Sequence, residues 1–438
     1  WFVKYLDLKN DLLAWGKEIT WHPEHMRHRY ENWVNGLQWD WLISNQRFFG
    51  VSFPLWYCSA CGEPILADEK QLPVDPLVDK PLAKNCPKCK NGEFIPETDV
   101  LNTWFTSSLT PQIAAARVEE KYRPALFPMD VRPQAHEIIS FWLFNTVVKS
   151  RLHFNKTPWK HAMISGFVTL KGEKMSKSKG LMVSPQNVAA QYGADAIRYW
   201  AASSKLGDDF DYQEKDVQTG KKFVTKILNA ANFVFLNMQV PEKIPTLLPA
   251  DAWMFSRLNE VIASCTSAFE DFNYSKSKLE ADHFFWHDFA DNYLELVKKR
   301  VYEGSAEEKA SAAYALYHAL LTILKLMAPF TPFVTEELYQ KHFRPREGKV
   351  SIHVEKWPEP FASIESENAA GKWARMLEII SFVRGKKSEA KKSMKAEVLL
   401  TLTKEDRALM GDALKDLSAV CNAKEVKTGT ERAVEILG

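Results

Sequence analysis

The chain has 438 residues, of which 46% are hydrophobic and 26% are charged, and its formal net charge is +2. This length allows two to four domains with at least one large core, and the composition excludes a disordered or fibrous protein. Six cysteines are too few for a disulfide scaffold in so long a chain, which favours metal binding in a reducing, cytoplasmic setting.

The first segment, residues 1–45, starts at Trp1 without a methionine, inside what reads as a running segment, so we expect a piece of a longer protein. A short strand is expected first. The amphipathic pattern around "ENWVNGLQWDWLIS" then predicts a helix. The motif "HPEHMRH" spaces three histidines by threes. We prefer an exposed helical turn to a metal site here, because no fourth ligand is suggested nearby.

Residues 46–98 begin with "FFGVSFPLWYC", which predicts a strand, and continue into a cysteine-rich insertion. Two C-x-x-C pairs lie 24 residues apart in this insertion. Four thiolates spaced in this way can close a tetrahedron around zinc with no open position, so the expected zinc ion is structural. Two redox pairs are the alternative. The four expected ligands are Cys58, Cys61, Cys86 and Cys89.

Residues 99–216 alternate apolar bursts such as "HAMISGFVTL" with helical stretches such as "HEIISFWLFNTVVKSRL". This alternation predicts α/β architecture. The stretch also contains "GEKMSKSKGLMV", with three lysines and two serines between Gly172 and Gly180.

The chain has neither a G-x-G-x-x-G fingerprint nor a P-loop, so any phosphate must be held by another device. A loop with flexible glycine flanks can close on a triphosphate and place ammonium groups where charge builds on a departing pyrophosphate. Lys174 and Lys177 would supply that charge, and Ser176 and Ser178 would add hydroxyl donors. A solvated surface loop is the alternative.

Residues 217–360 repeat apolar positions at intervals of three and four, which predicts a helix bundle. The longest apolar run, 310–334, is interrupted by His318, Lys325 and two prolines, so we expect a buried helix and no membrane partner. Residues 361–438 predict a linker, a helix over "NAAGKWARMLEIISFVRG", a basic run at 384–395, and then strand, helix, strand and strand.

The sequence "KMSKS" is the second signature of the class I aminoacyl-tRNA synthetases, and the chain resembles that family over essentially its whole length. Other stretches in the family's order are "WLISNQRFFG", "ETDVLNTWFTSSL", "RPQAHEIISFWLF" and "LLTILKLMAPFTPFVTEELY". Within the family the chain is most similar to the valyl branch of archaeal type.

The resemblance implies an α/β plus all-α fold. Residues 1–45 would return from an editing domain, 46–98 would form a zinc-knuckle insertion, and 99–216 the second half of a Rossmann-like catalytic domain. An anticodon-binding helix bundle would follow at 217–360, and a basic linker with a small α+β domain at 361–438.

The resemblance also implies site residues. Lys174 and Lys177 would be catalytic, and Glu137 would accept hydrogen bonds from the ribose hydroxyls. The implied ATP-binding set is His136, Glu137, Lys174, Met175, Ser176, Lys177 and Ser178.

Trp104, Ile138 and Trp142 match the positions that wall the amino-acid pocket, and two indoles with a branched aliphatic side chain leave a small apolar space that suits valine. Ordinary core packing is the alternative for each of the three. One methylene discriminates by only about 1–3 kcal/mol, so enzymes for such side chains need a second, hydrolytic site.

The chain departs from the family pattern at Leu181, Asn102 and Asn45, where asparagine, aspartate and arginine are usual. More importantly, none of its 11 histidines lies in the first signature, His-x-Gly-His, and most of the editing domain is missing. We therefore expect the chain to be inactive unaided.

The implied partners are valine, ATP with Mg²⁺, and tRNA(Val), and we expect a cytoplasmic monomer. Basic runs in "KKFVTK", "LVKKR" and 384–395 would hold tRNA phosphates. The whole enzyme would form valyl-adenylate, release pyrophosphate, and acylate the terminal adenosine. An isoleucyl-tRNA synthetase fragment and a non-catalytic tRNA-binding protein are the two alternatives.

Overall fold

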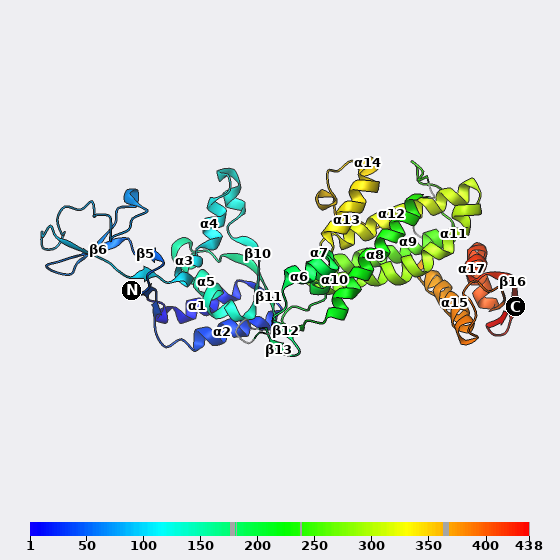
Figure 1. The fold of residues 1–438 in the computed structure, drawn as a ribbon, viewed down its shortest axis with the longest axis horizontal. Coiled ribbons are helices and arrows are strands. Elements are labelled where there is room, and N and C mark those ends of the chain that lie inside the picture. Colours follow the sequence, from blue (N-terminus) through cyan, green and yellow to red (C-terminus); the bar gives the residue numbers. More distant parts are fainter. Residues whose placement is uncertain (176–179, 181, 237–238, 362–367, 438) are drawn as a thin grey trace. The chain divides into compact units, whose positions relative to one another are not determined.

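A computed structural model describes residues 1–175, 180, 182–236, 239–361 and 368–437. Its chain divides into two compact units (Figure 1). The first unit contains Trp1–Phe167 with Leu206–Asp209, and the second contains Val168–Lys205 with Phe210–Gly438.

The first unit is built around a three-stranded parallel sheet in the order β10-β11-β2. Its strands are β10 (Met129–Ala135), β11 (Trp159–Ser165) and β2 (Thr20–His22). Helix α5 (Phe144–Phe154) lies between β10 and β11 in the sequence, which completes a β-α-β crossover. Helices α1 (Lys9–Lys17) and α2 (Arg27–Asn35) contribute to the same buried core. The expected α/β architecture is confirmed.

The helix predicted around residues 31–44 is wrong in its second half. Helix α2 ends at Asn35, and β3 (Trp41–Leu42) pairs antiparallel with β1 (Phe2–Val3). Between them, the Asp40 carboxylate accepts the backbone N–H groups of Tyr5 and Leu6 at 3.0 and 3.2 Å. Contacts with the start of the chain therefore override the local helical pattern.

The predicted strand at 48–58 is two short strands in different sheets. Strand β5 (Val51–Ser52) pairs with β9 (Val100–Leu101), which also pairs with β4 (Ser44–Asn45). Strand β6 (Leu55–Cys58) is the centre of a separate small sheet, between β7 (Pro64–Leu66) and β8 (Phe94–Pro96). Short helices α3 (Thr103–Ser107) and α4 (Thr110–Ala116) follow β9.

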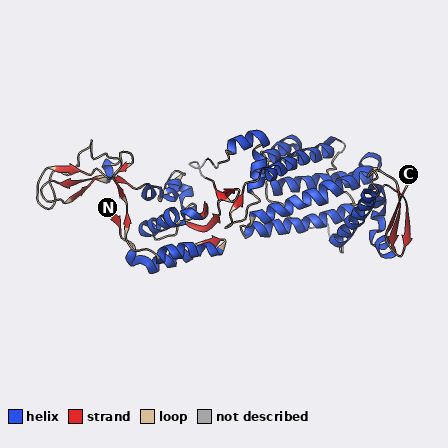
Figure 2. Cartoon of the chain, turned by 60° about the horizontal axis from the view of Figure 1, so that its bottom comes forward, coloured by secondary structure: helices blue, strands red, loops and turns tan. Residues whose placement is uncertain are grey.

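The second unit begins with the small sheet β13-β12-β14 and continues as a helix bundle, which confirms the helical prediction (Figure 2). The strands are β12 (Val168–Leu170), β13 (Glu173–Lys174) and β14 (Phe210–Asp211). The helices are α6 (Pro185–Tyr192), α7 (Ala194–Ala201), α8 (Glu214–Leu236), α9 (Pro249–Glu270), α10 (Tyr274–His283), α11 (Leu294–Glu303), α12 (Ala306–Met327), α13 (Pro332–Leu338), α14 (Arg344–Glu347) and α15 (Ala369–Glu389).

Helix α12 contains most of the long apolar run. By length and composition alone it could cross a membrane, but 83% of its most apolar window is buried inside the protein. Its neighbours include α9, α10 and α11. The helix therefore has the environment of a core helix in a bundle.

The C-terminal segment forms the sheet β16-β15-β17 with two helices. Strand β15 (Val398–Thr403) runs parallel to β16 (Ala423–Gly429) and antiparallel to β17 (Ala433–Ile436). The single helix expected between the strands is divided into α16 (Lys404–Met410) and α17 (Leu414–Cys421), because the chain turns at Gly411 with a φ of +47°.

A buried ion cluster joins this C-terminal segment to the bundle. The guanidinium of Arg300 on α11 lies 2.7 Å from each carboxylate oxygen of Asp251 on α9, and its Nε lies 2.9 Å from Asp416 on α17. Tyr293 and Ser311 donate further hydrogen bonds to Asp251. Two carboxylates thus share one guanidinium away from water, an arrangement that is costly unless every partner is in place.

We expect the Asp416 carboxyl to make stability depend on pH. Burial raises its pKa to about 6, Arg300 opposes this shift, and the Asp251 charge adds to it. The unfolded carboxyl titrates at about 3.9, so the folded state binds the proton more tightly, and stability should fall by about 2–3 kcal/mol as the pH rises from 4 to 7.

The measurement is urea unfolding at both pH values for the parent chain and Asp416→Asn. The free energy of unfolding of the parent should fall relative to the variant as the pH rises, because the variant cannot ionise. Exposed Asp412, in the same segment, gives the matched control Asp412→Asn. A constant difference between parent and Asp416→Asn would contradict this account.

Candidate functional site

The predicted nucleotide-binding residues of the first unit lie at the carboxyl end of β10. His136, Glu137 and Ile138 form one helical turn directly after the strand. The His136 ring packs edge-on against the Phe167 ring, with the two ring centroids 4.4 Å apart. The Nε2 atom of His136 lies 3.8 Å from a carboxylate oxygen of Asp209. Glu137 is exposed. This is the edge of a parallel sheet at which ligands usually bind.

Trp142 and Trp104 lie on neighbouring helical segments of the same unit. The Trp142 side chain is buried, and its Nε1 donates to the backbone oxygen of Ser107 on α3 at 3.1 Å. The guanidinium of Arg132 lies 3.9 Å from its ring centroid. Trp104, also on α3, is 39% exposed and stacks on Phe141 at 5.9 Å.

The surroundings of the three predicted pocket residues differ. Trp104 borders a hollow of about 470 Å³ that is otherwise lined by residues of α3 and α4, and neither Ile138 nor Trp142 is among the described residues that line it. Ile138 is half-buried beside the core. The three residues therefore share a neighbourhood in the first unit, and their role as pocket walls stays a prediction.

Helix α3, which carries Trp104, has only five residues and is anchored by side chains from outside it. Asn102 caps its first turn by accepting the Trp104 N–H at 2.8 Å, a role that asparagine and aspartate fill equally well. Lys149, buried on α5, donates to the Phe105 oxygen at 2.9 Å, and burial lowers the pKa of this lysine to about 8. An aspartate at position 102 could therefore cap α3 in the same way.

The described part of the lysine loop belongs to the second unit. Lys174 ends β13 and is exposed, and Met175 follows it. Ser176, Lys177, Ser178 and Leu181 lie outside the described residues. The third departure, Asn45, lies on β4 opposite Val100.

The four predicted metal ligands converge at one end of the β6 sheet. Cys58 is the last residue of β6, and the four sulfur atoms lie within 4.8 Å of one another. The sulfur of Cys58 lies 3.4 Å from that of Cys89, and the sulfur of Cys61 lies 3.6 Å from that of Cys86. Metal–sulfur bonds of about 2.3 Å require tetrahedron edges of about 3.8 Å, so the group fits one metal ion.

Backbone N–H groups favour the thiolate form of Cys58. Burial acts against ionisation of Cys58, but the N–H groups of Cys61 and Ala60 donate to its sulfur and lower its pKa. The Lys88 N–H donates to the Cys86 sulfur at 3.4 Å. Such N–H···S contacts orient ligands and stabilise their charge around a metal.

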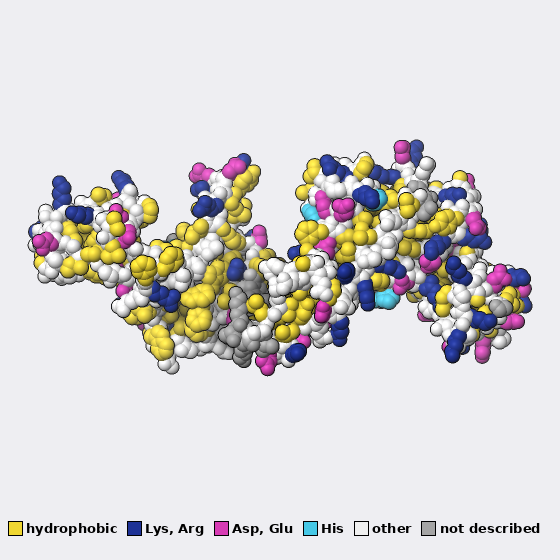
Figure 3. All heavy atoms as spheres, viewed as in Figure 1, with side chains coloured by type: hydrophobic (Ala, Val, Ile, Leu, Met, Phe, Trp, Pro, Cys, Tyr) yellow, Lys and Arg dark blue, Asp and Glu magenta, His cyan; other side chains and the backbone are white. Residues whose placement is uncertain are grey.

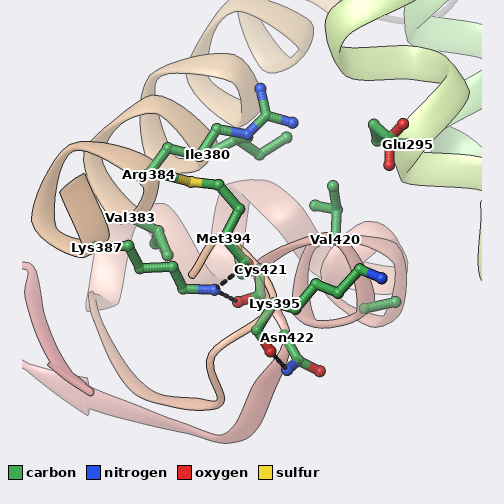
Figure 4. A pocket seen from close by; sticks show the side chains of 11 residues that line it. Glu295, Ile380, Val383, Arg384, Lys387, Met394, Lys395, Val420, Cys421 and Asn422 are labelled. Atoms are coloured by element: carbon green, nitrogen blue, oxygen red, sulfur yellow. Dashed lines mark hydrogen bonds between the residues drawn. The ribbon is translucent and has the colours of Figure 1, made fainter. Parts of the chain in front are cut away.

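Some basic side chains of the predicted tRNA-binding runs form hydrogen bonds and ion pairs within the protein. Lys387 is almost fully buried, and its ammonium group donates to the backbone oxygens of Met394 and Cys421 at 2.9 and 2.8 Å, as Figure 4 shows. Lys387 and Arg384 line one cavity of about 510 Å³. The guanidinium of Arg384 donates to the side-chain oxygen of Asn292 at 2.8 Å. Arg300 belongs to the ion cluster.

On the face seen in Figure 3, the remaining Lys and Arg side chains of the second unit are interspersed with Asp and Glu. Exposed lysines in the predicted basic runs are Lys221, Lys222, Lys299, Lys386, Lys391, Lys392 and Lys395.

Sequence reasoning missed the residues that hold the candidate site residues in position. Arg132, Phe141 and Lys149 contact Trp142 or α3, and no sequence pattern singled them out. Asp209 and Asp211 were visible in the acidic stretch "GDDFDY" beyond the lysine loop, but no role was inferred for them.

Comparisons with known proteins match both units. The family description "tRNA synthetases class I (I, L, M and V)" fits residues 1–213, and "Anticodon-binding domain of tRNA ligase" fits residues 251–403. The chain is 40% identical to the valine–tRNA ligase of Thermoplasma acidophilum, covering 92% of this chain and 51% of that protein. For the valine–tRNA ligase of Anaplasma marginale the identity is 40%, over 100% of this chain and 53% of the relative.

The chain thus spans about half the length of the curated relatives it matches. Among solved structures, it is similar to the ternary complex of Agrobacterium radiobacter K84 agnB2 LeuRS with tRNA and LeuAMS. That likeness has a TM-score of 0.58 at 17% identity and covers 91% of this chain and 51% of the other, so it supports the fold alone.

The cysteine group yields a direct test. Titration with Co²⁺ should give the absorption bands of one tetrahedral ion with four thiolate ligands per chain, because the sulfur geometry fits that coordination. Cys86→Ser should abolish this spectrum. Cys265→Ser, in the buried core of the bundle, is the control and should retain it. A Cys86→Ser spectrum identical to that of the parent would rule out the proposed ligand set.

Proposed function

We propose that this chain, which belongs to the class I tRNA synthetases and is homologous to valine–tRNA ligases, carries the lysine-loop half of a valine–tRNA ligase active site together with its anticodon-binding domain. The observation that supports this most strongly is the 40% identity to valine–tRNA ligases across at least 92% of the chain. The family description covers isoleucyl and leucyl enzymes too, but these relatives are named for valine.

In the proposed reaction, the whole enzyme joins valine to ATP as an adenylate and passes the acyl group to the terminal adenosine of tRNA(Val). ATP, bound with Mg²⁺, supplies the activating phosphoanhydride. Glu137 accepts hydrogen bonds from the ribose, and His136 lies beside the nucleotide. Lys174 and Lys177 stabilise the negative charge that develops on the leaving pyrophosphate more than the charge of bound ATP, which lowers the barrier.

Trp104, Ile138 and Trp142 form the apolar wall for the valine side chain in this proposal. The hydrogen bond from Trp142 to Ser107 and the Arg132 guanidinium against the Trp142 ring fix the orientation of that indole. A rigid wall excludes larger side chains by overlap, whereas it discriminates weakly against smaller ones.

The four cysteines hold a structural zinc ion, since a closed set of four thiolates leaves no position for substrate. Exposed lysines on α8, α11 and the segment after α15 contact tRNA phosphates, with a contribution that weakens as salt increases. We place the protein in the cytoplasm as a monomer, where ATP, valine and tRNA meet under reducing conditions.

The test is valine-dependent exchange of pyrophosphate into ATP. This chain alone should be silent, and fusion to the amino-terminal half of the Anaplasma marginale relative should give activity that prefers valine to isoleucine. In the fusion, Lys177→Ala should lower kcat by on the order of 10²–10³-fold because charge stabilisation in the transition state is lost.

Each alternative predicts a different result. A preference for isoleucine would favour the isoleucyl enzyme. A silent fusion, together with binding of unmodified tRNA by this chain, would favour a non-catalytic tRNA-binding protein.

A further inference from the structure

A tight hairpin of the second unit, formed by β12 and β13, directly precedes the lysine loop in the chain. Strands β12 and β13 are joined by Lys171 and Gly172, whose φ angles are +57° and +79°. Two consecutive positive φ angles are typical of a type I′ turn, the connection that best matches the twist of two-residue hairpins. Lys171 is not a glycine, so its left-handed conformation requires support from the surroundings.

A carboxylate from another strand supplies that support. One oxygen of Asp211, on β14, accepts the Gly172 N–H at 3.0 Å and the Thr169 hydroxyl at 2.9 Å. The N–H of Gly172 lowers the pKa of Asp211, with further contributions from Thr169 and the Lys171 N–H. Consecutive backbone N–H groups at a turn form a nest for an anion, and here the anion is built into the chain.

Asp211 is itself held in place from two sides. The backbone of β14 pairs in parallel with β12, so that Asp211 lies opposite Thr169, and the Tyr212 N–H donates to the Thr169 oxygen at 2.8 Å. Next to it, the Phe210 ring stacks on Trp200 of α7 at 5.1 Å. The carboxylate therefore reaches the turn from a strand that cannot easily shift.

The position of the turn determines the position of the first lysine. In the hairpin register, Thr169 lies opposite Lys174 and Leu170 opposite Glu173. A shift of one residue would reverse the side on which the Lys174 side chain emerges. Gly172 occupies a turn position with a positive φ, and its N–H donates to Asp211.

We propose that Asp211 is a positioning residue for the lysine loop, fixing the turn and register from which Lys174 and the rest of the loop depart. This inference rests on the proposed function for its catalytic meaning. The other two carboxylates of the stretch have different surroundings: Asp209 accepts the Phe167 N–H at 2.7 Å in the first unit, and Asp208 is exposed.

Limited trypsin digestion of this chain tests the structural part without any activity. Trypsin cleaves after lysine, and cleavage within a folded protein follows the population of locally open states. Asp211→Ala should accelerate cleavage in 171–179 roughly tenfold, whereas Asp211→Asn, which keeps an acceptor oxygen, should accelerate it less. Asp208→Ala is the matched control and should digest at the parent rate.

Thermal unfolding separates local from global effects. We expect Asp211→Ala to unfold at nearly the parent temperature, although trypsin cleaves it faster within 171–179. Equal cleavage rates for parent and Asp211→Ala would overturn it, as would a variant that is cleaved faster at all sites alike.

Pyrophosphate exchange in the fused enzyme tests the catalytic part. Asp211→Ala should lower kcat on the order of tenfold to a hundredfold with little change in KM for valine, because misplaced cations weaken transition-state contacts more than amino-acid binding. Asp211→Asn should recover much of the loss. A fusion without activity would defeat the proposed function while leaving the digestion result valid. An active fusion with unchanged kcat in Asp211→Ala would defeat the positioning role.

Discussion

Backbone pairing between strands that are distant in the sequence positions the candidate site residues of this chain. The parallel pair β10 and β11 brings Ala135 opposite Ser165, so the turn that carries His136 and Glu137 starts where both strands end. The pair β12 and β14 brings Asp211 beside the turn that precedes Lys174. A strand in such a pair has no freedom to slide by one residue, since every side chain would change faces. The chemistry of the site therefore depends on registers set elsewhere in the chain.

Buried charge in the helical unit serves the fold. Arg300 lies between Asp251 and Asp416, and Lys387 donates to the backbone oxygens of Met394, ahead of β15, and of Cys421, the last residue of α17. The larger buried cluster of this unit extends from α7 to α17, so the C-terminal segment shares the core of the bundle. Because these cations are buried, the phosphate contacts of the proposed function would fall to the exposed lysines, and such contacts weaken as the salt concentration rises.

The sequence allowed prediction of those features that local patterns determine. Local patterns predicted the helices of the bundle and the order of the C-terminal elements, and the structure confirms both. The spacing of the four cysteines predicted that their sulfur atoms would converge, and they do. The helix expected at 31–44 failed because β3 is stabilised by pairing with residues near the start of the chain. Trp142 was named, but Arg132, which contacts its ring, and Lys149, which anchors α3, lie on a strand and a helix with no distinguishing pattern. Long-range contacts of this kind leave no periodic trace in a single sequence.

The division of the chain has a topological consequence for how the protein can be taken apart. The boundary between the units is crossed at 167/168, at 205/206 and again at 209/210. The short return, Leu206–Asp209, completes the first unit: the Gly207 N–H donates to Ile164, and Asp209 accepts from Phe167. No single cut can therefore release an intact first unit, and a shortened or recombined protein with one junction near residue 167 would lose the Gly207 N–H bonded to Ile164 of β11 and the Asp209 carboxylate bonded to Phe167. Each unit is compact in itself, but the two are interlaced in their covalent order.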